Sequence, residues 1–133
     1  MYHDSAVGDI KKKTGFDVNK RGCTLNAVIW SRSVQHGGNC SSVFEKATAG
    51  MDLSKATDEE IIRAIYAESG KTTNTPPNAY SKKITAKDKA LYNISGDYMA
   101  YFSRSDSHTQ AGVYNRLHNT ELNEALEMLK IYG

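Results

Sequence analysis

Apolar residues recur along this chain at helical spacing, and no segment alternates apolar and polar residues in the manner of a half-buried strand. The clearest helical segment is 24–36, TLNAVIWSRSVQH, which ends at the glycine pair 37–38. Its apolar residues point in nearly every direction around a helical axis, which is typical of a buried helix. The pattern predicts an all-α, compact domain around a buried central helix over 24–36. The apolar residues are Leu25, Ala27, Val28, Ile29, Trp30 and Val34.

Three helix N-termini are indicated by a serine or threonine followed three positions later by glutamate or glutamine, the spacing of a capping box. They predict helices over 43–49, over 58–69 and from about 108 onwards, with a break near 118–120. The pairs are Ser42 with Glu45, Thr57 with Glu60, and Ser107 with Gln110.

The other segments give weaker patterns. Residues 1–21 are polar and basic, and we expect a solvated helix face followed by a loop. Residues 71–83 contain two adjacent prolines and predict an exposed loop. Residues 85–103 predict two short helices divided at Gly96. A short hairpin somewhere in the otherwise all-α chain is left open. We expect one domain over 1–133.

Composition narrows the function classes. Hydrophobic residues make up 39% and charged residues 24%, and the net charge of +2 is too balanced to indicate nucleic acid binding. A mildly basic surface suits an anionic polymer such as a bacterial wall, but it also suits an ordinary soluble surface. No apolar run approaches the length of a membrane span, and the start, MYHDSAVGDIKKK, lacks the apolar core of a classical signal peptide. We expect synthesis in the cytoplasm without such a signal.

The two cysteines, Cys23 and Cys40, lie at either end of the predicted central helix. Such a helix separates its ends by roughly 18 Å, whereas a disulfide needs Cα atoms within about 7 Å. The three residues 37–39 are too few to bring the ends together. The sequence therefore predicts two free thiols.

Glu68 is the candidate general acid. It shares the inward face of its predicted helix with Ile61 and Ile65, in the last turn, where the helix dipole is negative. Burial and the dipole would both raise the pKa of this carboxyl, as the proton donor of glycoside hydrolysis requires. Pairing with a lysine or arginine is the alternative, and no second carboxylate has a sequence context that marks it as the partner.

Cys40 is a second candidate. It precedes a predicted helix N-terminus, which stabilises a thiolate, and His108 or His118 would supply the base of a Cys/His amidase. An ordinary thiol is the alternative. His36 and Cys40 alone do not make a metal site, and we expect no metal and no cofactor.

The stretch AVIWSRSVQHGG, residues 27–38, resembles a helix followed by Val-Gln-His-Gly in chitosanase-like and lysozyme-like glycan hydrolases of phage and type VI secretion spike proteins. The segments 43–50, 58–70 and 101–129 are similar to the same group. The resemblance covers the chain in order. It implies the C-terminal lobe of a peptidoglycan hydrolase, with the catalytic glutamate of the family upstream in a Tyr-Glu-Ser-Gly motif. YAESG, residues 66–70, corresponds by position to a later segment.

The resemblance also implies a role for particular side chains. Gln35 and His36 become candidates for contact with sugar or for shaping the cleft wall, while His36 as a helix C-cap is the structural alternative. Independently of the resemblance, Arg32 could line a groove or pair with buried backbone, and Tyr66 could stack on a sugar or belong to the half-buried core. The protein would be delivered to the bacterial cell wall or periplasm and bind peptidoglycan or a related polysaccharide. A partner chain with the missing half, or self-association, would cover the exposed apolar surface.

Three hypotheses follow. We favour a glycan-handling lobe that is inactive alone. A small muramidase-like glycoside hydrolase with Glu68 as the acid is the second, and a Cys40/His amidase is the third.

Overall fold

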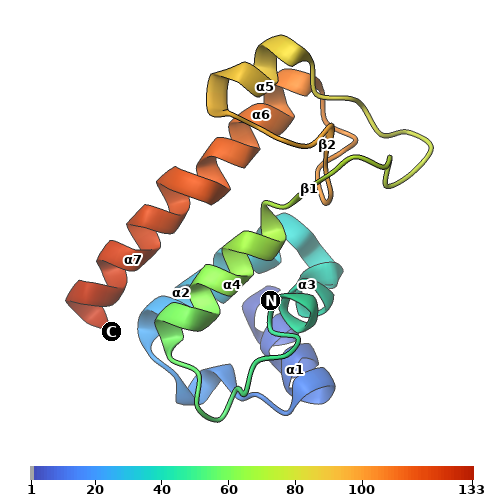
Figure 1. The fold of residues 1–133 in the computed structure, drawn as a ribbon. Coiled ribbons are helices and arrows are strands. Elements are labelled where there is room, and N and C mark those ends of the chain that lie inside the picture. The colour runs from blue at the N-terminus through green and yellow to red at the C-terminus, as the bar shows by residue number, and fades with distance from the viewer. Residues whose placement is uncertain (1) are drawn as a thin grey trace. The chain divides into compact units, whose positions relative to one another are not determined.

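The computed structural model describes residues 2–133, with side chains from Asp4 onwards, and the chain is mostly helical as predicted (Figure 1). Its backbone contacts form two compact units. Unit 1 comprises the residues up to Glu68 together with Asn123–Gly133, and unit 2 comprises Ser69–Leu122. The single domain expected from the sequence stays a prediction, and each unit is described by itself.

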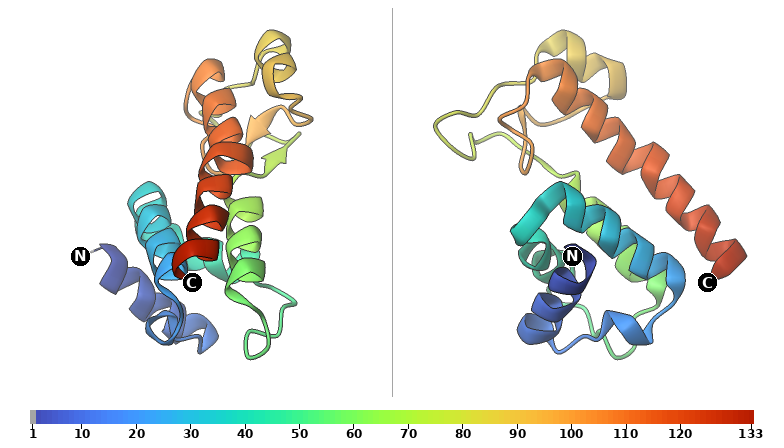
Figure 2. Two further views of the ribbon diagram at one scale, coloured as in Figure 1. Left: turned by 90° about the vertical axis from the view of Figure 1, so that its left-hand side faces the viewer. Right: turned by 180° about the vertical axis from the view of Figure 1, so that it is seen from behind.

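Unit 1 is built from helices α1 (Tyr2–Thr14), α2 (Cys23–His36), α3 (Cys40–Ala47) and α4 (Asp58–Ser69), with short 3₁₀ turns at η1 (Val18–Lys20) and η2 (Gly37–Asn39). Helices α1, α2 and α3 pack against one another (Figure 2). Phe16 and Phe44 stack with their ring centroids 5.6 Å apart. Buried aliphatic side chains from all four helices, Ile10, Leu25, Ile29, Val43, Ile61 and Ile65, form the core.

Helix α7 (Glu121–Tyr132) belongs to unit 1 from Asn123 onwards. The Gly133 carbonyl accepts a hydrogen bond from the Thr24 amide at 3.1 Å, and so satisfies one N–H at the start of α2. Gly22 lies so close to this end that an added Cβ would stand 2.8 Å from the Gly133 carbonyl carbon. A side chain is therefore excluded at position 22.

The central helix is buried on one face only. Ile29 is 1% exposed, as predicted, but Trp30 is 57% and Val34 48% exposed. The prediction that apolar residues are covered all around this helix is wrong for these two positions. The sequence pattern counts apolar residues around the axis, but it does not say on which side other elements pack.

The capping-box predictions had mixed outcomes. Helix α4 is confirmed from Asp58 to Ser69, and Thr57 and Glu60 exchange hydrogen bonds between side chain and backbone at 3.2 and 3.1 Å. Helix α3 begins at Cys40, so Ser42 lies inside the helix and cannot cap it. The turn at η2 leads directly into α3, which explains the earlier start.

Unit 2 contains α5 (Ala86–Tyr92), α6 (Ser107–Asn115), the π-helical turn η3 (Arg116–Thr120) and a two-stranded antiparallel sheet of β1 (Thr72–Thr73) and β2 (Tyr98–Met99). A long segment that includes α5 connects the two strands, so the sheet is not the short hairpin that the sequence left open. The second short helix expected after Gly96 is wrong. A Cβ at Gly96 would meet Thr72 at 2.5 Å, so the glycine permits the close approach. The break expected near 118–120 is the π-helical turn.

Helix α6 is capped by Asp106, whose carboxylate accepts from the Thr109 amide at 2.8 Å, and not by Ser107. Gln110, expected to complete that cap, is instead fully buried. It packs beside a small apolar cluster of Ile84, Ile94, Met99 and Ala111. Within the residues described, no helix combines the length and apolar character needed to cross a bilayer.

Candidate functional site

The predicted site residues of unit 1 lie on two helices. Arg32 of α2 places its guanidinium carbon 5.6 Å from the centroid of the Tyr66 ring on α4, a cation–π contact. Arg32 is 1% and Tyr66 2% exposed, so neither side chain reaches solvent. This burial favours a role in holding α2 against α4 over direct contact with a ligand.

Gln35 and His36 are the accessible members of the set. They are the last two residues of α2, and Gln35 is exposed while His36 is partly buried. Burial first, and then the positive charge of Arg32, lower the pKa of His36 to about 4. The imidazole is therefore neutral at physiological pH and can both donate and accept hydrogen bonds.

Gly37, and not the His36 side chain, closes the C-terminus of α2. Its φ of 58° suits glycine, and its amide donates to the Ser33 carbonyl. The Gly37 amide thus makes the hydrogen bond that closes the helix, and a cap from the His36 side chain is not required.

A small cleft of about 190 Å³ adjoins this turn. Its walls come from the first turns of α1, from the glycine pair and from the start of α3. The lining residues are Ser5, Ala6, Asp9, Gly37, Gly38, Cys40 and Ser41. The stretch that resembles Val-Gln-His-Gly therefore borders an opening in unit 1.

Cys40 does not carry the activated thiolate that the amidase hypothesis needs. The side chain is buried, and burial raises its pKa to about 11, although the charge of Arg32 acts in the opposite direction. Desolvation therefore outweighs the favourable charge of Arg32. Among the residues described, no three histidine, cysteine or acidic side chains lie together as metal ligands.

Both cysteines are free, as predicted, and they differ in exposure: Cys23 is exposed and Cys40 is buried. We expect a disulfide reagent to titrate one thiol per folded chain quickly and two in denaturant, because only Cys23 is accessible. Cys23→Ser should remove the fast thiol, and Cys40→Ser should leave it. Two fast thiols in the folded protein would show that Cys40 is accessible.

Glu68 lies in the last turn of α4, as predicted, and is partly buried. Its raised pKa and its role as a general acid stay predictions.

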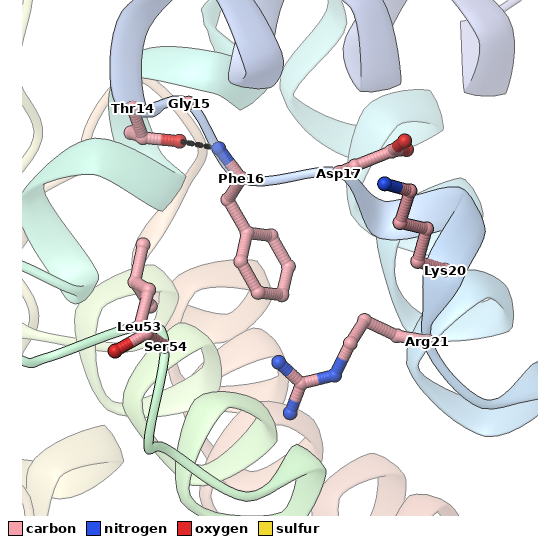
Figure 3. Close-up of a pocket in the computed structure, with 8 residues that line it drawn as sticks. All are labelled: Thr14, Gly15, Phe16, Asp17, Lys20, Arg21, Leu53 and Ser54. Atoms are coloured by element: carbon pink, nitrogen blue, oxygen red, sulfur yellow. Dashed lines mark hydrogen bonds between the residues drawn. The ribbon is translucent and has the colours of Figure 1, made fainter.

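Sequence reasoning missed a larger opening in unit 1, which we call the Phe16 pocket (Figure 3). It has a volume of about 430 Å³. Phe16 and Leu53 supply apolar surface, and Lys20 and Arg21 supply positive charge. The basic residues of segment 1–21 indicated positive charge in this part of the chain. The sequence did not indicate that residues 14–21 lie close to residues 53 and 54. The lining residues are Thr14, Gly15, Phe16, Asp17, Lys20, Arg21, Leu53 and Ser54.

Residues 1–93 match the family model of the type VI secretion system spike protein VgrG3-like, C-terminal. No curated protein and no solved structure matches the chain. The match confirms the type VI secretion part of the resemblance. The lysozyme-like and chitosanase-like part stays a prediction.

Proposed function

We propose that this chain, which belongs to the VgrG3-like C-terminal family of type VI secretion system spike proteins, is a glycan-handling lobe that binds peptidoglycan in the target cell. The proposal combines the family with the resemblance of residues 27–38 to glycan hydrolases. The family match supports a type VI secretion context, and peptidoglycan lies in the wall or periplasm that a secreted spike protein would reach.

One observation carries the proposal: exposed Gln35 and partly buried His36 directly precede the glycines that border a cleft, on a helix fixed by buried Arg32 and Tyr66. Sugar hydroxyls need partners that both donate and accept hydrogen bonds, and an amide and a neutral imidazole do so. The lowered pKa of His36 keeps the imidazole in that form at neutral pH. Rigid support from the buried pair reduces the entropy lost on binding.

Binding without cleavage is the favoured form of the proposal. Glycoside hydrolysis needs two carboxylates across a cleft, and no second carboxylate has a sequence context that marks it as the partner of Glu68. Hydrolysis by Glu68 is the second candidate. It is supported by the partly buried position of Glu68 in the last turn of α4, two residues after Tyr66. The covering of Trp30 and Val34 by a second chain or a second copy stays a prediction.

Co-sedimentation with purified peptidoglycan sacculi tests the binding. We expect the chain to pellet with sacculi, and Gln35→Ala with His36→Ala to weaken the interaction about tenfold, from two lost hydrogen bonds. His108→Ala on the exposed start of α6 is the matched control and should bind normally. Equal binding by the double variant would contradict the proposed site.

Loss of turbidity of the same sacculi separates binding from hydrolysis. The favoured form predicts unchanged turbidity. A fall in turbidity that Glu68→Gln abolishes would instead establish the second candidate, and one that Glu68→Gln leaves intact would exclude Glu68 as the acid.

A further inference from the structure

The Phe16 pocket contains a positive charge that its neighbours do not neutralise. Arg21 is paired with Asp58 at 2.7 Å, and Asp17 lies 3.8 Å from the Lys11 ammonium. Asp17 also accepts the Asn19 amide at 3.0 Å. Lys20 is exposed and has no ion-pair partner within the part of the chain that the structure describes. The pocket therefore presents one ammonium group available to an anion.

The opposite side of the pocket is apolar. Figure 3 shows the Phe16 ring between Leu53 and Ser54 on one side and Lys20 and Arg21 on the other. The Arg21 guanidinium carbon lies 5.1 Å from the Phe16 ring centroid, and its Nε and Nη2 atoms donate to Asp58 and to the Ala56 carbonyl. These contacts and the stacking of Phe16 on Phe44 fix the ring without a ligand and leave it only 8% exposed. The small exposed part of the ring and the Leu53 side chain therefore form a preformed apolar wall.

Size and chemistry together select a class of ligand. A volume of about 430 Å³ suits a single sugar or a dipeptide. We propose that the Phe16 pocket binds a carboxylate joined to a small ring or apolar body, with the carboxylate on Lys20 and the body against Leu53 and the small exposed part of Phe16.

Peptidoglycan offers this chemistry from two sources: the C-terminus of the peptide stem, and the lactyl group of N-acetylmuramic acid where its amide bond to the stem has been cleaved. The choice of a wall component rests on the proposed function. Gln35 and His36, at the glycine turn, would bind neutral hydroxyls, and the Phe16 pocket would add a preference for carboxylate.

Amide chemical-shift titration of the whole chain tests the proposal with three soluble probes. N-acetylmuramic acid and N-acetylglucosamine differ in the lactyl carboxylate, and D-alanyl-D-alanine carries the peptide carboxylate. We expect N-acetylmuramic acid or the dipeptide to shift the amides of residues 14–21 and 53–54, and N-acetylglucosamine to leave them unchanged. The probe that acts identifies the source.

Lys20→Gln should weaken that binding about three- to fivefold, as the loss of one solvent-exposed charge pair implies. Lys46→Gln, on exposed α3 surface outside the pocket, is the matched control and should bind as the parent does. Added salt should weaken binding in the parent and much less in Lys20→Gln.

The proposal would be overturned if neither N-acetylmuramic acid nor the dipeptide shifted these amides. It would also be overturned if N-acetylglucosamine shifted them equally, or if Lys20→Gln did not weaken binding. Sacculus binding with a silent Phe16 pocket would refute this inference alone. Pocket binding without sacculus binding would refute the proposed function alone.

Discussion

Gln110→Leu is expected to lower the free energy of unfolding by about 3 kcal/mol, because it leaves buried backbone groups without partners. The Gln110 side chain is fully buried at the centre of unit 2. Its oxygen accepts from the Met99 amide at 2.9 Å, and its nitrogen donates to the carbonyls of Lys82 and Ser105 at 2.6 and 2.9 Å. One side chain thus joins strand β2, the segment before α5 and the turn before α6.

Leucine is close to glutamine in volume, so the substitution removes hydrogen bonds with little change in packing. The measurement is urea unfolding, with hydrogen exchange to locate the loss. Exchange should accelerate at the Met99 amide and elsewhere in residues 69–122 first, because those groups lose their partner. Gln35→Leu applies the same change at an exposed position and should stay within about 0.5 kcal/mol of the parent. A loss below about 1 kcal/mol in Gln110→Leu would mean that the backbone groups find other partners.

Gln110 also shows why residues 93–105 were hard to predict. The sequence offered apolar residues there that fit a short helix, and nothing local opposes it. The strand pairing of Thr72 with Met99 depends on a side chain from α6 and on the missing Cβ of Gly96. Both contacts join residues that are far apart in the sequence, so a local sequence pattern does not predict them.

Local signals were sufficient elsewhere. The start of helix α4 was predicted correctly because Thr57 and Glu60, three positions apart, form a capping box there. The capping signal of Ser42 failed because η2 leads into α3 before that serine is reached. A local motif therefore predicts an end well only where no neighbouring turn already supplies it.

The candidate site was predictable in part. The resemblance pointed to Gln35 and His36, which the structure places at the end of α2, directly before the glycines that border a cleft. Their contact with sugar stays a prediction. The burial of Arg32 over Tyr66 could not be predicted, because it depends on how α2 and α4 pack. The Phe16 pocket was missed for the same reason, since it joins residues 14–21 to residues 53 and 54.

Acidification should destabilise the protein between pH 6.5 and about 4 through His36. Its pKa is about 4 in the folded protein, because the ring is partly buried and lies near the charge of Arg32, and near 6.5 in an unfolded chain. Between these values the unfolded chain binds a proton that the folded chain does not. Stability therefore rises with pH across the window, is fully present above 6.5 and is lost as the pH falls toward 4.

The expected contribution is about 1 to 3 kcal/mol, with the lower part of the range favoured by partial exposure of the ring to solvent. Urea unfolding at intervals from pH 4 to 7.5 measures it. His36→Gln, which cannot titrate, should flatten the curve within this window. Two carboxyls affect stability at lower pH. Hydrogen bonds from Ser107 to Asp88 and from the Thr109 amide to Asp106 lower the pKa of these carboxyls. Their contributions to stability are therefore lost below about pH 4.

His108 provides the control, because its side chain is 86% exposed. His108→Gln should keep the slope of the parent protein, and the difference between the two variants isolates His36 from a general effect of losing a histidine. Equal slopes in His36→Gln and the parent would show that the imidazole titrates alike in both states. In that case His36 would be protonated in mildly acidic solution, and sacculus binding at pH 5 would lose the neutral acceptor on which the proposed glycan contact depends.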